Sequence, residues 1–201
     1  LGVDAHRGAG AKEIYTQVRI TDLATAVKPQ DTGTTRVAVV KDQKNSNVDG
    51  GTFTSGAWRD RDLTVKDDPF NFVTLYPTTN GQTSESPGND PGYFALPAGK
   101  YKIRFSAPAF KVDRHMAAMV WSSTESYINK TYSSSDPRDG EIHGSSEISQ
   151  DDSGRVSNDS KGAFVVEITQ TSYFKVIHYA NTGSSNYCLL YTSDAADDAN
   201  C

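Results

Sequence analysis

Four histidines are the residues of this sequence whose type is most suited to metal binding or proton transfer. His6, His115, His143 and His178 are far apart, with no His-x-His or His-Glu-x-x-His spacing. His115 and His178 could hold a metal ion if neighbouring strands bring them together. The alternative is that both are histidines with satisfied hydrogen bonds in a core or an interface. We predict the second, and therefore no metal site.

Carboxylates and hydroxyls are the other candidates for chemistry. Asp49, Asp60 and Asp62, and the pair Asp151-Asp152, could act as catalytic acids or as calcium ligands. They lack the ligand spacing of a calcium-binding loop, and acidic runs in turns are usually solvated. There is no Gly-x-Ser-x-Gly elbow and no phosphate-binding glycine loop. We therefore predict that the protein is not an enzyme and needs no cofactor.

Charge and hydropathy argue against two kinds of partner. The formal net charge is −5, from 20 Lys and Arg against 25 Asp and Glu. An acidic chain is a poor ligand for the polyanionic backbone of a nucleic acid. No apolar run approaches the roughly 18 residues that a membrane-spanning helix needs. We expect neither a nucleic-acid partner nor insertion into a membrane.

The elements that must position these residues are β-strands, because hydropathy alternates with a period of two. In the segment 101–109, Tyr101 and Ile103 alternate with Lys102 and Arg104, so apolar side chains would face a core and basic ones water. Frequent turn signals without a helical period favour an all-β sandwich, jelly roll or barrel. Further strands are predicted at 12–20, 57–65, 93–96, 114–122, 163–170 and 173–180.

Three blocks of sequence carry a resemblance to a known family. They are residues 50–63 (GGTFTSGAWRDRDL), residues 94–109 (FALPAGKYKIRFSAPA) with Arg114-His115 after them, and residues 174–179 (FKVIHY). Together they resemble a family of phage virion proteins described as tail-fibre or structural proteins. That family is similar to the jelly rolls of tumour necrosis factor and of the complement globular head.

The resemblance implies a fold and a function. The fold is an antiparallel, jelly-roll-like β-sandwich of the tumour necrosis factor type. The function is that of a non-enzymatic structural protein of the virion, a trimeric tail-fibre or appendage domain that contributes to host attachment. Its partners would be copies of itself, other virion proteins, and a host receptor or glycan. Two alternatives stay open: a capsid-decorating or neck scaffold protein without receptor binding, and a secreted ligand of the complement-head type.

The resemblance also predicts how the chain is divided. Residues 1–20 are expected to hold the terminal strand of an upstream module, 21–47 a linker with at most one short strand, and 48–187 the jelly roll. In the family a strand with the pattern Glu-Val-Tyr-Thr-x-Val-x-Ile closes the domain, and here this pattern stands at 13–20. We therefore predict that the segment 12–20 can fill the slot of the last strand, by strand addition to an open sheet edge.

Two sets of residues are candidates for contact with partners. Aromatic side chains in or beside polar loops offer rigid contact area to a receptor or glycan, although a loop tyrosine can also fold back onto the sandwich. The segment 173–180 is apolar on both faces, which indicates the interior of a sheet or a subunit contact. The predicted receptor contacts are Tyr127, Tyr132 and Phe110, and the predicted trimer interface is formed by Phe174, Val176, His178 and Tyr179.

The last residues resemble a translated sequencing adapter. Residues 188–198 read CLLYTSDAADD, and such segments are excluded from reasoning about a fold. We expect 188–201 to be non-native, the alternative being a genuine acidic tail. Cys188 and Cys201 both lie there, so the rest of the chain has no thiol for a disulfide, a zinc site or a nucleophile.

Overall fold

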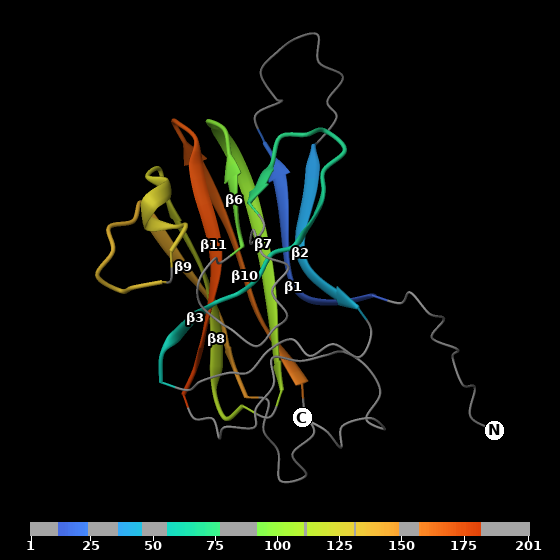
Figure 1. Cartoon of the computed structure of the whole chain (residues 1–201), viewed down its shortest axis with the longest axis vertical. Coiled ribbons are helices and arrows are strands. Elements are labelled where there is room, and N and C mark those ends of the chain that lie inside the picture. Colours follow the sequence, from blue (N-terminus) through green and yellow to red (C-terminus); the bar gives the residue numbers. More distant parts are fainter. Residues whose placement is uncertain are drawn as a thin grey trace, which may run out of the picture.

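The computed structural model describes residues 12–23, 36–45, 56–76, 92–110, 112–130, 132–148 and 157–181. Within these ranges the chain forms two antiparallel β-sheets that pack face to face as a β-sandwich (Figure 1). The predicted all-β sandwich is thus confirmed. The expected non-native tail at 188–201 lies outside the described residues. None of the helices in the described ranges has the length and hydropathy of a membrane span.

The first sheet has five strands in the order β10-β7-β1-β2-β4. β1 lies at its centre, where Ile20 pairs with Ile103 of β7 on one side and with Ala38 of β2 on the other. The segment 12–20 therefore lies inside the sandwich, and β2 lies in the range predicted as a linker. Where one module ends and another begins stays a prediction. The strands are β1 (Lys12–Asp22), β2 (Val37–Asn45), β4 (Val65–Asp67), β7 (Gly99–Phe110) and β10 (Ser157–Ile168).

The second sheet has six strands, and five of them follow in the order β5-β6-β11-β8-β9. β8 pairs with one edge of β11 along its whole length, so β6 and β3 share the other edge, at opposite ends of β11. A 3₁₀ helix, η2 (Glu125–Tyr127), follows β8. The strands are β3 (Trp58–Asp60), β5 (Thr74–Tyr76), β6 (Tyr93–Leu96), β8 (His115–Ser122), β9 (Gly140–Glu147) and β11 (Ser172–Ala180).

The prediction of one strand over 57–65 is wrong. The chain forms two short strands there, β3 and β4, and they belong to different sheets. Between them it crosses from one layer of the sandwich to the other, and the crossing buries Arg61 and Leu63. The backbone N–H of Arg61 still donates to the carbonyl of Val176, at 2.9 Å. No continuous strand forms here because the chain leaves one sheet before it joins the other.

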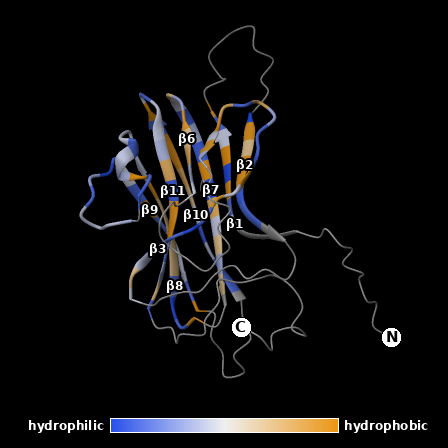
Figure 2. Ribbon diagram, in the orientation of Figure 1, coloured by the Kyte–Doolittle hydropathy of each residue, from blue (hydrophilic) through white to orange (hydrophobic). Residues whose placement is uncertain are grey.

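The core lies between the two sheets, because alternate side chains of each strand turn inward. Figure 2 shows this alternation as hydrophobic and hydrophilic bands along the strands. Phe94 of β6 and Phe174 of β11 stack with their ring centroids 5.4 Å apart, and burying each such side chain stabilises the fold by about 1.5–3 kcal/mol. Other fully buried members of this core are Val18, Ile20, Val40, Leu96, Ile103, Met119 and Val176.

β11 is sealed on both faces within one chain. Phe174, Val176 and His178 have no exposed surface, and Phe174 and Val176 belong to the central core. The prediction that these three form a trimer contact is therefore wrong, because none of them reaches the surface that a second copy would touch. Tyr179 is partly exposed, with its ring centroid 5.5 Å from that of Trp58.

The face of β11 opposite the core is covered by residues 123–130 and 132–139, which lie between β8 and β9. Ile128, just after η2, packs with Ile177 and with two residues of β8 in a second apolar cluster. Lys175 anchors this cover: its Nζ lies 2.9 Å from Asp60 Oδ1 and donates to the carbonyl of Lys130 at 2.7 Å. β11 is apolar on both faces because both of its faces are covered within the same chain.

The neighbouring edges of β9 and β10 are joined by serine side chains. Ser160 Oγ donates to the carbonyl of Ser145 at 2.6 Å, and Ser145 Oγ accepts from the backbone N–H of Lys161 at 3.0 Å. Ser160 Oγ also accepts from the N–H of Ala117, at 2.8 Å. These bonds tie β10, the edge strand of the first sheet, to the second sheet and so fix the strand that carries Lys161.

Candidate functional site

The outer face of the five-stranded sheet carries a group of basic side chains, which we call the basic face. Strand alternation turns these residues away from the core, and the register places them in rows. Arg19 of β1 stands directly opposite Arg104 of β7, and Lys102 stands opposite Thr21. The acidic residues of the same strand faces, Asp67, Asp159 and Glu167, lie on the two edge strands. The basic face consists of Arg19, Lys41, Lys100, Lys102, Arg104 and Lys161.

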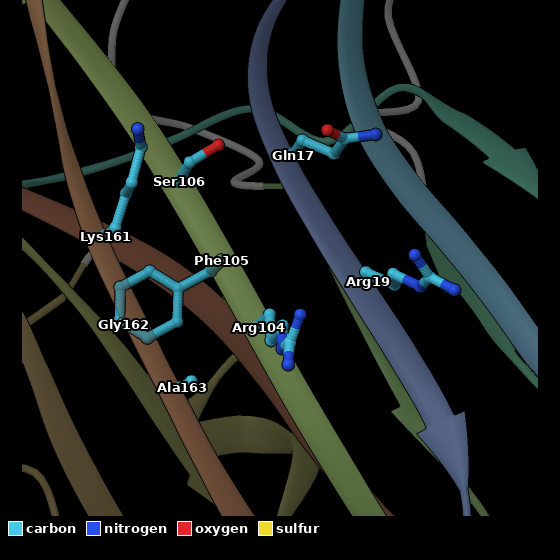
Figure 3. A pocket seen from close by; sticks show the side chains of 8 residues that line it. All are labelled: Gln17, Arg19, Arg104, Phe105, Ser106, Lys161, Gly162 and Ala163. Carbon is cyan, nitrogen blue, oxygen red and sulfur yellow. The ribbon is translucent and has the colours of Figure 1, made fainter.

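A hollow of about 440 Å³ lies in the middle of the basic face (Figure 3). This volume falls within the ~300–1,000 Å³ range of small-molecule sites. Phe105 and Gly162 pair across the two strands beneath it, and the neighbouring outward residues Ser106 and Ala163 are short. Longer side chains surround these small residues, so the depression is framed by cations. It is lined by Gln17, Arg19, Arg104, Phe105, Ser106, Lys161, Gly162 and Ala163.

The two arginines lack a neutralising partner among the described residues. Like charges directly opposite each other on neighbouring strands destabilise a sheet by a few tenths to about 1 kcal/mol. Lys161 has Asp159 at 3.6 Å, but both side chains are well exposed, at 68% and 36%, so water screens the pair. None of the described residues that line the hollow is acidic. The hollow therefore presents net positive charge to the solvent.

This set of side chains is suited to binding an anion. Two guanidinium groups offer planar forks of N–H donors, which match carboxylate, sulfate or phosphate oxygens. Ser106 and Gln17 add a hydroxyl and an amide, which can both donate and accept hydrogen bonds. The described residues of the lining include no carboxylate, histidine or thiol, so these groups can bind and orient a ligand but do not supply a general base.

None of the three predicted receptor contacts is among the described residues that line the basic hollow. Tyr132 folds back onto the sandwich: its N–H donates to Asp60 Oδ2 at 3.0 Å, and its hydroxyl accepts from Arg138 at 2.7 Å. Tyr132 is therefore part of the cover over β11. This is the alternative given above, in which a loop tyrosine folds back onto the sandwich. Tyr127 is half-buried in η2, with Lys130 Nζ 5.7 Å from its ring centroid. The backbone of Phe110 pairs with Ser157 at the end of β7, and its side chain lies outside the description.

The fold brings His115 and His178 together inside the sandwich. Their ring nitrogens Nδ1 and Nε2 are 2.9 Å apart, at hydrogen-bond distance. Two nitrogens bound to one tetrahedral zinc ion would be about 3.3 Å apart, so the geometry is that of a core pair. The other two predicted metal-ligand candidates do not join them: His143 bonds to Glu141 on the surface, and His6 is outside the described residues. Within the described ranges, no three His, Cys, Asp or Glu residues are grouped for a metal ion.

Burial sets the protonation of this histidine pair. It lowers the pKa of His115 to about 4, and the nearby Arg61 charge adds to the effect, while Glu147 and Asp159 oppose it. It lowers the pKa of His178 well below its usual value, with Arg61 and His115 acting in the same direction. Arg61 is itself buried, and its Nε donates to Thr16 Oγ1 at 2.8 Å. The pair is neutral at pH 7 and stabilises the core.

Of the candidate carboxylates, Asp60 and Asp62 belong to the described residues, within which no three His, Cys, Asp or Glu residues are grouped. Asp60 is held by Lys175; burial raises its pKa more strongly than the lysine lowers it. Asp49, Asp151 and Asp152 lie outside the described residues. Comparisons with models of known families, with curated proteins and with solved structures find no match. The function of the chain therefore has to be inferred from its sequence and from the basic hollow.

Proposed function

We propose that this chain is a non-enzymatic structural module of a phage virion, part of a tail fibre or similar appendage, and that it contributes to host attachment. The three sequence blocks that resemble phage virion proteins support the assignment. They contain β3, most of β6 and β7, and most of β11. The resemblance thus covers strands that build the core of the sandwich.

The order of strand pairing supports the jelly-roll part of the proposal. β8 pairs with β9, β7 with β10 and β6 with β11, so each pair encloses the previous one in the sequence. Rolling a long antiparallel hairpin produces this nesting. Apart from the short strands β3, β4 and β5, the next pair in the series would join β2 to a strand after β11, and β1 pairs with β2 in this place. This agrees with the expectation that the segment 12–20 can act as a closing strand.

The basic hollow is the observation that supports the proposed role in host attachment. Cell surfaces display anionic polymers, and a cationic face raises both the encounter rate and the affinity for them. The hollow is an open depression in which two arginines and a lysine surround short side chains. The strand register fixes the backbone positions from which Arg19 and Arg104 extend, directly opposite each other.

Assembly as a homotrimer is part of the proposal, with a contact outside β11. Three identical hollows on one particle would multiply a weak single-site affinity through effective concentration. Joining the copies through their basic faces would bring like charges together, so we expect the contact on another surface. Sedimentation of the purified chain at micromolar concentration tests this part, and a monomer would contradict it.

A cell-binding experiment tests the attachment proposal. The fluorescently labelled chain is incubated with a panel of environmental bacterial isolates, with labelled serum albumin as the control. We expect saturable binding to a subset of the isolates. Binding to none of them, combined with binding to purified virion proteins, would favour the capsid-decorating or neck scaffold alternative.

A further inference from the structure

We propose that the basic hollow binds the anionic group of an acidic polysaccharide, a carboxylate or sulfate carried on a sugar ring. This inference rests on the proposed attachment function, and it assigns the class of ligand. The cationic rim, the small floor and the neutral hydrogen-bonding side chains of the hollow each contribute a separate argument.

The rim fits one oxyanion held by two arginines. Arg19 and Arg104 are directly opposite each other, and paired residues on antiparallel strands have Cβ atoms about 4.5–5.5 Å apart. Both side chains are exposed. In Figure 3 Arg19 extends from β1 towards β2, away from Arg104, so Arg19 has to adopt another rotamer for both guanidinium groups to contact one oxyanion. An oxyanion between the two guanidinium groups would remove their mutual repulsion and accept charge-assisted hydrogen bonds.

The floor and the remaining side chains fit a sugar better than a bare ion. Ala163 is opposite Arg104 in the strand register, and Ser106 is opposite Gln17. The Ala163 methyl offers a small apolar contact for a sugar C–H face. Ser106 and Gln17 offer neutral hydrogen-bonding groups for sugar hydroxyls. A hollow of about 440 Å³ has room for such a ring.

A nucleic acid fits the observations less well than a glycan. A duplex is bound by a long positive stripe that follows its phosphates. Here Asp67 and Asp159 bound the rows of the basic face on its two edge strands, and the whole chain has a net charge of −5. The cations are therefore concentrated on the three central strands and on Lys161, which suits one or two sugar units.

The test measures binding of the full chain to four probes: oligogalacturonate, dextran sulfate, neutral dextran and a DNA duplex. We expect oligogalacturonate or dextran sulfate to bind at least about tenfold more tightly than neutral dextran, which has no anionic group for the two arginines. We expect the same margin over duplex DNA, because the acidic residues on the two edge strands interrupt the long positive stripe that a duplex needs. A preference for one of the two acidic polymers identifies the anionic group as carboxylate or sulfate. Binding to neither of them would overturn the proposal.

Three variants locate the binding. Arg19→Gln/Arg104→Gln removes the rim charges, and Ala163→Ile fills the floor without a change of charge. Arg114→Gln/Lys130→Gln is the control, because it removes two exposed cations outside the basic face. We expect each hollow variant to weaken binding about tenfold or more and the control to retain it.

Equal losses in the control and in the double arginine variant, or duplex DNA bound as tightly as the acidic polysaccharides, would show non-specific attraction and overturn the inference. Thermal melting checks that each variant is folded, and Ala163→Ile keeps the test decisive if the arginine variant is unstable. Cell binding without polysaccharide binding would refute this inference alone. Polysaccharide binding without cell binding would instead refute the attachment function.

Discussion

Acidification should destabilise the sandwich through the buried pair His115 and His178. An unfolded histidine titrates near pH 6.5, whereas burial lowers the pKa of His115 to about 4 in the folded chain. A lowered folded-state pKa means that the unfolded state takes up the proton first, so stability is fully present above pH 6.5. It is lost as the pH falls from 6.5 towards 4. His178 acts in the same direction.

The size of the effect follows from the difference between the two pKa values of His115. A gap of about 2.5 pH units corresponds to about 3 kcal/mol of unfolding free energy, of which about 2 kcal/mol is lost between pH 7.5 and pH 5. Asp60 works the other way, because its raised pKa lets the folded state take up a proton more readily. The parent must therefore be compared with a variant in which only His115 is changed.

Urea unfolding followed by tryptophan fluorescence measures the effect at the two pH values. In His115→Gln the loss of stability between pH 7.5 and pH 5 should be smaller than in the parent by about 2 kcal/mol. In the control His143→Gln, at an exposed histidine, the loss should be close to that of the parent. A His115→Gln variant with the same pH dependence as the parent would refute the reasoning.

Three further substitutions test how the sandwich is held together, each by urea unfolding at pH 7.5. Lys175→Met should cost about 3–5 kcal/mol because it leaves Asp60 buried and unpaired, whereas Lys175→Met/Asp60→Leu should recover most of the loss; a double variant as unstable as the single one would contradict this. Gly140→Ala should cost about 1–3 kcal/mol, since a Cβ there overlaps the neighbouring indole ring, and an unchanged midpoint would count against it. Ile20→Asp should abolish folding by placing a charge in the core, whereas Thr21→Asp, facing outward, should change stability by less than about 1 kcal/mol; similar effects of both would argue against the register of β1.

Strands whose two faces differ could be predicted from the alternation of hydropathy. Residues 101–109 alternate cleanly because one side chain in two meets the core and the next meets water, and this range lies within β7. Residues 57–65 lack this clean alternation, since Arg59 and Arg61 stand in phase with Leu63, and the chain there crosses between the sheets. A period of two in hydropathy indicates which side chains turn inward. It does not indicate which strands pair through their backbones.

The apolar segment 173–180 shows why a covering element could not be foreseen. Its double apolarity fits an interior strand or a subunit contact equally well. The choice depends on whether residues 123–139, with Ile128, pack on it. That packing is fixed by long-range contacts such as the ion pair of Lys175 with Asp60, and local sequence carries no signal for it.

The basic hollow was missed for a related reason. Lys102 and Arg104 were expected to face water. They form a basic face only together with Arg19, and Arg19 lies beside them because of the register between β1 and β7. The net charge of −5 concealed this face, because a total charge says nothing about its distribution. A helical-wheel or motif search would not have found it, since its residues come from three separate segments.

We propose that the chain attaches to a cell through the basic hollow. Binding isotherms on one responsive bacterial isolate test it most directly, for the parent chain, Arg19→Gln/Arg104→Gln and the control Arg114→Gln/Lys130→Gln. We predict that the hollow variant binds at least about tenfold more weakly than the parent, since two charge-assisted contacts are lost, while the control binds like the parent. Equal binding by all three proteins would contradict the claim.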